Sequence, residues 1–128
     1  LRCSACDHGQ PGGEPAGVCP HCGQPLLAEY AHVARGARAA RWDLWRYAPV
    51  LPLVSGEVPV SLGEGLTPFV EAPALARQLG VGRVWVKDEG RNPTASFKAR
   101  GMSAAVTRAR ALGAAGVVVP TAGNAGAA

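Results

Sequence analysis

The sequence predicts an α/β fold preceded by a small cysteine-rich segment. Two C-x-x-C pairs lie in a first stretch that is rich in glycine and proline and has almost no helical or strand periodicity. A pattern of strand, helix, strand and helix follows in the later part of the chain. Of the 128 residues, 48% are hydrophobic and 17% are charged, so the chain has enough apolar side chains to build a core.

The pattern divides the chain into three predicted segments. Residues 1–26 form the cysteine-rich unit, and residues 27–62 form a connector anchored by large aromatic side chains. Residues 63–128 form the α/β part. Because this last segment is short, we expect it to be the beginning of a larger domain.

Local patterns predict the elements of the α/β part. Residues 73–79 suit a short helix closed by Gly80, and residues 83–87 (RVWVK) alternate like a strand. Residues 96–112 favour a helix that Gly113 ends. Its apolar face recurs every three to four residues, and consists of Met102, Ala105 or Val106, Ala109 and Leu112.

The end of the chain continues the α/β pattern. Residues 116–119 (GVVV) suit a strand buried on both faces, followed by a glycine loop and a helix beginning near Ala125. This order predicts a parallel sheet with right-handed crossovers. Residues 111–128 carry no charge, but their glycines and proline favour this buried strand over a membrane span. Since so few strands and one covering helix cannot bury both sheet faces, we expect a truncated protein.

Charge and cysteine usage exclude some classes of protein. The net charge is +4, and eleven of the thirteen basic residues are scattered arginines. Because a nucleic-acid surface needs clustered basic residues, we expect no nucleic-acid partner. No export signal is visible, so a cytoplasmic protein with reduced cysteines is expected, without a membrane partner.

The two C-x-x-C pairs, separated by twelve residues, match the spacing of a zinc ribbon. Four thiolates complete a tetrahedron at about 2.3 Å from the ion, so the predicted zinc is structural. His8 and His21 lie beside these cysteines and are expected to be bystanders. Redox cysteines, two disulfides or a rubredoxin-like iron site remain alternatives. The predicted ligands are Cys3, Cys6, Cys19 and Cys22.

Lysine is scarce, and Lys98 lies in a distinctive setting. Lys87 and Lys98 are the only lysines. Lys98 is expected in the first turn of a helix, where the helix dipole and Arg100 both disfavour the ammonium form. Only a neutral amine attacks a carbonyl, so Lys98 is a candidate nucleophile. The alternative is an ordinary surface lysine at a helix start.

A glycine-containing loop follows the predicted strand 116–119. At such a place free backbone N–H groups can hold an anion such as a carboxylate, and Asn124 offers both a donor and an acceptor. The candidate substrate-binding residues are Thr121, Ala122, Gly123 and Asn124.

Two motifs in this order resemble one enzyme family. N-P-T-A-S-F-K-A-R-G at 92–101 resembles the lysine segment of the tryptophan-synthase-β-like, fold type II, pyridoxal phosphate (PLP) enzymes, and T-A-G-N-A-G at 121–126 resembles their S/T-x-G-N-x-G loop. The resemblance implies that Lys98 forms the internal aldimine with PLP. It also implies that the loop holds the substrate carboxylate and that Asn124 reaches the 3′-oxygen of PLP.

The wider order of motifs is similar to that of threonine synthases from one bacterial and archaeal group. It consists of the C-x-x-C pairs, W-R-Y at 45–47, G-E-G-L-T-P at 63–68 and the lysine segment. The resemblance implies a zinc ribbon followed by the start of a fold type II domain. The PLP phosphate loop and the pyridine-nitrogen partner would lie beyond residue 128. Ala95 departs from the usual glycine, and Ala99 from the commoner aspartate.

The implied reaction converts O-phosphohomoserine and water to threonine and phosphate. Lys98 would also act as base and acid on the substrate carbons. The small-molecule partner is therefore an amino-acid phosphate, and a homo-oligomer is possible for the full-length enzyme. The fragment alone is expected to be inactive. Alternatives are threonine dehydratase, cysteate synthase, O-phosphoserine sulfhydrylase, or a zinc-ribbon binding module with a non-catalytic α/β segment.

Overall fold

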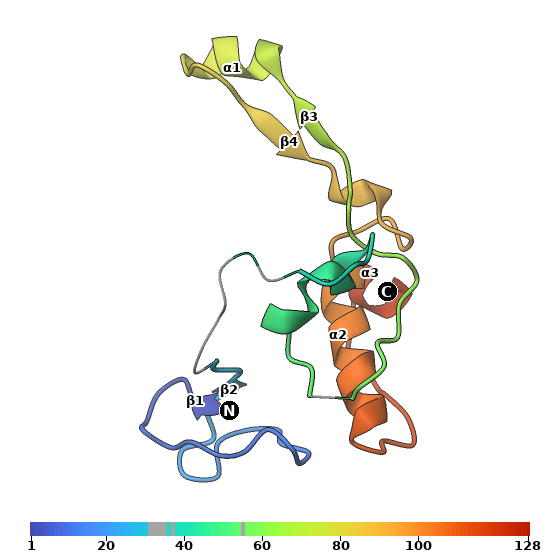
Figure 1. The fold of residues 1–128 in the computed structure, drawn as a ribbon. Helices are drawn as coiled ribbons and strands as arrows, with labels where there is room; N and C mark the ends of the chain where they lie inside the picture. Colours follow the sequence, from blue (N-terminus) through green and yellow to red (C-terminus); the bar gives the residue numbers. More distant parts are fainter. Residues whose placement is uncertain (31–35, 37, 55) are drawn as a thin grey trace.

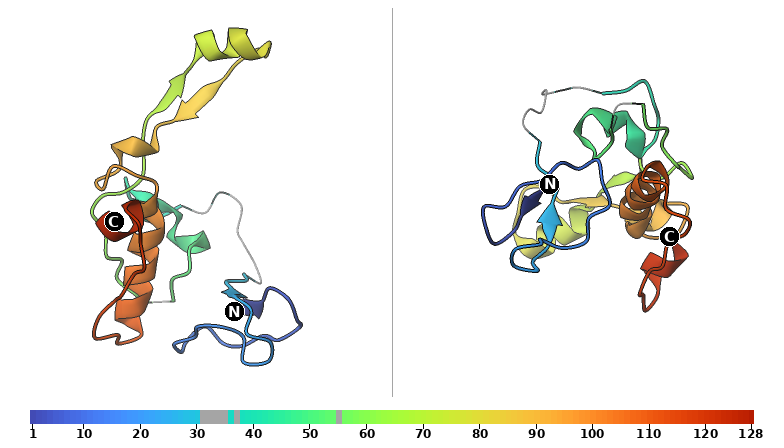
Figure 2. Two further views of the ribbon diagram at one scale, coloured as in Figure 1. Left: turned by 180° about the vertical axis from the view of Figure 1, so that it is seen from behind. Right: turned by 90° about the horizontal axis from the view of Figure 1, so that it is seen from below.

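The computed structural model describes residues 1–30, 36, 38–54 and 56–128. A cysteine-rich unit, a central helix α2 (Lys98–Ala111) and a projecting hairpin can be distinguished in Figure 1. The hairpin extends from the N-terminal end of α2, while the cysteine-rich unit stands to one side of the helix in both views of Figure 2. The predicted connector, 27–62, lies partly outside the described residues.

The cysteine-rich unit is built from the same turn used twice. In the first turn Cys3 N donates to His8 O at 2.9 Å, and in the second Cys19 N donates to Gln24 O at 2.8 Å. The ends of the unit are joined by β1 (Arg2–Cys3) and β2 (Leu26–Leu27), which pair antiparallel. The turns therefore bring both C-x-x-C pairs to one place.

The predicted helix 73–79 is confirmed, but the sheet beside it is not parallel. Strand β3 (Phe69–Glu71) pairs antiparallel with β4 (Trp85–Lys87), with Val70 opposite Val86. Helix α1 (Pro73–Leu79) ends at Gly80, whose φ is 66°. The ladder continues through Ala72 N to Val84 O at 2.9 Å. Because the chain enters α1 directly after Ala72, this short helix closes the hairpin instead of crossing over a sheet.

The predicted strand at 116–119 is wrong for this structure. These residues have no regular secondary structure, and Val118 is 95% exposed. A buried strand needs neighbours on both edges for its backbone hydrogen bonds, and the described residues place none there. The predicted helices on either side are present as α2 and as α3 (Asn124–Ala127), which contact each other.

The buried face of α2 also differs from the predicted apolar face. Ala99 and Thr107 are buried, and Ser103 between them faces the same extended segment. The Ser103 hydroxyl donates to Val60 O at 2.6 Å, and Val60 N donates to Thr107 Oγ1 at 2.9 Å. Among the described residues the backbone at Val60 has no strand partner, and helix hydroxyls supply its hydrogen bonds. Met102 and Val106 are only half-buried.

Among the described residues, no helix combines the length and the apolar character needed to cross a membrane.

Candidate cofactor and metal sites

The turn before Lys98 has a left-handed residue at its end. Ala95 N donates to Asn92 O at 2.8 Å, and Ala95 has a φ of 55°. An L-residue with a side chain is disfavoured in this conformation. The conformation explains why the resembling motif has glycine where this chain has Ala95.

Lys98 is the first residue of α2 and therefore lies in the first turn of the helix, as predicted. Its backbone N–H donates to the buried Ser96 hydroxyl oxygen at 3.3 Å, which satisfies one of the free N–H groups at the helix start. The side chain is exposed, and Nζ lies 4.7 Å from the centre of the Phe97 ring. No carboxylate of the described residues forms an ion pair with Lys98.

The loop at 121–126 is closed by one hydroxyl. Thr121 Oγ1 accepts hydrogen bonds from Gly123 N and Gly126 N, both at 3.1 Å. A Cβ on Gly126 would lie 2.4 Å from Thr121 Cγ2, so the closed loop has no room for a side chain there. The expectation that the loop's N–H groups are free is therefore wrong for these two amides.

Lys98 and the loop line the same hollow. It has a volume of about 470 Å³, opens to solvent, and is bounded by Lys98 together with residues 120–125. Ligand pockets of about 300–1,000 Å³ hold small molecules of cofactor size. The structure therefore brings together Lys98 and the four predicted substrate-binding residues: Thr121, Ala122, Gly123 and Asn124.

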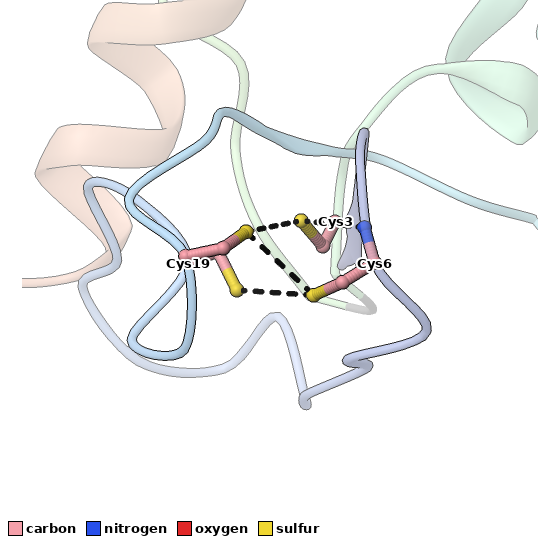
Figure 3. A group of neighbouring side chains, drawn as sticks. Cys3, Cys6 and Cys19 are labelled. Atoms are coloured by element: carbon pink, nitrogen blue, oxygen red, sulfur yellow. Dashed lines mark hydrogen bonds between the residues drawn. The ribbon is translucent and has the colours of Figure 1, made fainter.

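The four cysteine sulfurs form a compact cluster (Figure 3). They all lie within 4.8 Å of one another. The separation from Cys3 to Cys22 is 3.4 Å, while Cys6 is 3.7 Å from both Cys19 and Cys22. Four sulfurs at about 2.3 Å from a zinc ion stand about 3.8 Å apart, so the cluster has the right size for the ion. None of the four cysteines is in a disulfide.

Two thiols of the cluster differ strongly in pKa. The backbone N–H of Ala5, aided by that of Cys6, lowers the pKa of Cys3 to about 6 despite the opposing effect of burial. The His8 N–H lowers the pKa of Cys6, but the contact with Cys3 and burial outweigh it and raise this pKa to about 12. The thiolate form is thus favoured at Cys3 over Cys6, and a divalent cation would favour the thiolate of each cysteine that binds it.

Both histidines lie outside the sulfur cluster. The rings of His8 and His21 lie against each other with centroids 4.4 Å apart and planes tilted by 34°, and His8 Nε2 is 3.0 Å from Gln10 Oε1. Within the part of the chain that the structure describes, the only group with metal-binding geometry consists of the four cysteines.

Comparison with known proteins identifies the family. Residues 60–128 match the family described as pyridoxal-phosphate dependent enzyme. The chain belongs to this family. The match contains Lys98, the loop 121–126 and the hollow between them, and it begins close to the predicted boundary at residue 63.

Several curated relatives of this PLP-dependent chain carry the name threonine synthase. The protein from Synechocystis sp. is 47% identical over 107 residues, which cover 80% of this chain and 28% of the relative. The protein from Methanosarcina acetivorans is 34% identical over 133 aligned positions, covering 100% and 32%. The chain spans about a third or less of the relatives it matches. No solved structure matches it significantly.

One buried carboxylate of this chain was not predicted from the sequence. Glu64 is 1% exposed and accepts hydrogen bonds from Trp45 Nε1 at 3.1 Å, Leu62 N at 2.8 Å and the Ser61 hydroxyl at 3.1 Å. The Ser103 hydroxyl of α2 lies within hydrogen-bond distance of Glu64 as well, so Val60 O and Glu64 share its one proton. Glu64 therefore joins the connector, the G-E-G-L-T-P segment and α2. The charged residue between two glycines was its only sequence signal.

A second missed carboxylate lies next to the lysine segment. Glu89 accepts two hydrogen bonds from Arg100, at 2.7 and 2.8 Å, and one from the Thr67 hydroxyl at 2.6 Å. Arg100 lowers the pKa of Glu89 to about 2. The positive charge of Arg100 is therefore paired with this carboxylate, whereas the sequence analysis had considered Arg100 only as one of two influences on Lys98.

Proposed function

We propose that this chain is the lysine-bearing part of a threonine synthase, which converts O-phosphohomoserine and water to threonine and phosphate. The observation that carries the proposal is the hollow shared by Lys98 and the loop 121–124, in a chain of the PLP-dependent family. Relatives named threonine synthase support this substrate over those of other enzymes in the family.

The residues around the hollow have different proposed roles. Lys98 would hold the cofactor through its aldehyde carbon, and Asn124 would contact the cofactor's 3′-oxygen. The loop from Thr121 to Asn124 receives the substrate carboxylate. When bound, PLP supplies an electron sink for the substrate carbons. Lys98 then moves a proton at those carbons, a role that its exposed side chain permits.

We also propose that the cysteine cluster holds one structural zinc. Four sulfurs at tetrahedral spacing leave no open coordination position, so the ion would stabilise the fold and take no part in catalysis. The compact geometry favours a metal site over isolated redox cysteines.

Lysine replacement in the full-length polypeptide that carries this sequence tests the cofactor role. Lys98→Ala is expected to lose covalently attached PLP, measured by borohydride trapping and peptide mapping, and to lose at least about a thousandfold in turnover. Lys87→Arg is the matched control, because it removes the other lysine of residues 1–128. Retention of both properties by Lys98→Ala, or their loss in Lys87→Arg, would reject Lys98 as the cofactor residue.

Substrate choice is tested separately. Phosphate release from O-phosphohomoserine is expected to exceed release from O-phosphoserine in the presence of sulfide by orders of magnitude in kcat/KM. Threonine must appear in equal amount to phosphate. The opposite preference would assign the chain to a sulfhydrylase, and ammonia release from threonine would assign it to a dehydratase.

A further inference from the structure

Glu89 contacts the lysine segment on both sides of Lys98. On the N-terminal side, Asn92 Nδ2 donates to Glu89 Oε2 at 3.0 Å and to Glu89 O at 2.9 Å. On the C-terminal side, Arg100 donates through Nε and Nη2 to both carboxylate oxygens. The segment from Asn92 to Arg100 is thus a loop closed on one side chain.

The same carboxylate joins this loop to the G-E-G-L-T-P segment. The buried Thr67 hydroxyl donates to Glu89 Oε1 at 2.6 Å. Asn92, itself buried, accepts a hydrogen bond on Oδ1 from Gly65 N at 3.0 Å. The loop is therefore anchored to a second stretch of chain, which fixes where the loop lies as well as how it closes.

Lys98 lies between the two contacts but is not part of them. Its side chain is exposed and lines the hollow, while Glu89 and Arg100 are 24% and 27% exposed. A two-pronged arginine–carboxylate contact fixes the orientation as well as the separation of its partners. Partial burial limits its screening by solvent.

We propose that Glu89 is a positioning residue for Lys98: by closing the segment from Asn92 to Arg100, it sets the point from which Nζ enters the hollow. The inference rests on the proposed function, because it assigns Glu89 to the cofactor lysine. Small displacements of a reacting group lower the rate of its reaction steeply. Loss of the Glu89 contacts should therefore lower the reactivity of Lys98 more than that of any other amine.

The two lysines allow a ratio measurement within each molecule. The full-length polypeptide is freed of cofactor and mixed with PLP, the product is trapped with borohydride, and the modification rates of Lys98 and Lys87 are compared by peptide mapping. The variants are Glu89→Gln, Arg100→Gln and the double variant. Glu71→Gln is the control, because the one ion pair that Glu71 forms with the described residues is an exposed contact with Arg83 at 3.8 Å. Thermal unfolding is recorded for each protein.

Glu89→Gln is expected to lower the Lys98-to-Lys87 ratio about tenfold, as for loss of a charge-assisted contact. Glu71→Gln should leave the ratio unchanged. The double variant should be no worse than the worse single variant, because Glu89 acts through Arg100. If Glu89→Gln does not fold, Thr67→Val replaces it. This variant removes one donor to Glu89 and should lower the ratio about threefold.

An unchanged ratio in a folded Glu89→Gln or Thr67→Val protein overturns the positioning role, even if the protein unfolds at a lower temperature. Additive losses in the double variant overturn the route through Arg100. If the unmodified protein itself shows no preference for Lys98, the proposed cofactor role fails and the positioning role fails with it. If the preference is present and survives the substitutions, only the positioning role fails.

Discussion

The cysteine-rich unit and the region around α2 stabilise their chain segments by different means. In the first unit the buried side chains are Cys3 and Cys19, so little apolar surface holds the two turns together. Around α2, Trp45 is fully buried, but its indole N–H donates to the buried Glu64, and Thr107 is a second buried polar side chain. The first region depends on one cluster of sulfurs, and the second on many separate polar contacts. A substitution in the sulfur cluster should therefore unfold the whole first region, whereas a substitution near α2 should lower the stability of the second region by only part.

The largest expected effect is loss of the metal site. Cys19→Ala should lose bound zinc and the amide protection of residues 1–27, because apparent zinc-binding free energies of about 10–16 kcal/mol serve as folding free energy. Metal analysis and hydrogen exchange measure both. Protection within α2 should persist. His21→Ala, which changes a residue outside the sulfur cluster, should keep the zinc. Full amide protection of residues 1–27 in metal-free protein would show that the first region does not depend on a metal at the sulfur cluster.

The next effect concerns a close approach of two backbones near α2. A Cβ on Gly65 would lie 2.6 Å from Leu44 N, and Gly65 has a φ of 108°. Gly65→Ala should lower the free energy of unfolding by about 3 kcal/mol, from the clash and the backbone strain together. Gly63→Ala is the control, since its φ is 84° but no atom lies within 4 Å of the added carbon. Equal losses in denaturant titrations would show that the close approach has no effect.

A smaller loss is expected at the buried indole. Trp45 Nε1 donates to Glu64 at 3.1 Å and lies 3.0 Å from the Ser103 hydroxyl oxygen. Trp45→Phe removes this donor and should lower the free energy of unfolding by about 1–3 kcal/mol, because a buried acceptor loses a partner. Trp42→Phe should have almost no effect, because Trp42 is 84% exposed. Similar losses in both variants would mean that ring size, not the hydrogen bond, matters.

The smallest expected effect is a gain in stability. Ala95→Gly relieves the left-handed strain at φ 55° but increases the entropy of the unfolded chain, so the net stabilisation should reach at most about 1 kcal/mol. Ala105→Gly makes the same chemical change at an exposed position within α2 and should destabilise by about 1 kcal/mol. Two losses of equal size would show that the turn does not strain Ala95. Thermal unfolding of both variants distinguishes these outcomes.

Signals that act over a few residues were readable in the sequence. The helix 73–79 and its Gly80 end are confirmed, and α2 begins and ends within two residues of the prediction. The spacing of the C-x-x-C pairs predicted a cluster, and the four sulfurs do lie together. Each of these features depends on one turn of chain and its own backbone hydrogen bonds. The zinc itself and the roles of Lys98 and Asn124 stay predictions.

Tertiary structure decided the features that depend on which distant segments meet. The antiparallel pairing of β3 and β4 could not be read from RVWVK, because a strand pattern does not specify its partner. Glu64 and Glu89 were not predicted as site residues, since Trp45 and Ser103 reach Glu64, and Thr67 reaches Glu89, from other segments. The sequence by itself determined local turns, helices and the two motifs. The contacts between segments brought Lys98 and the loop 121–124 to one hollow, because hydrogen bonds across long separations form only when the whole chain packs.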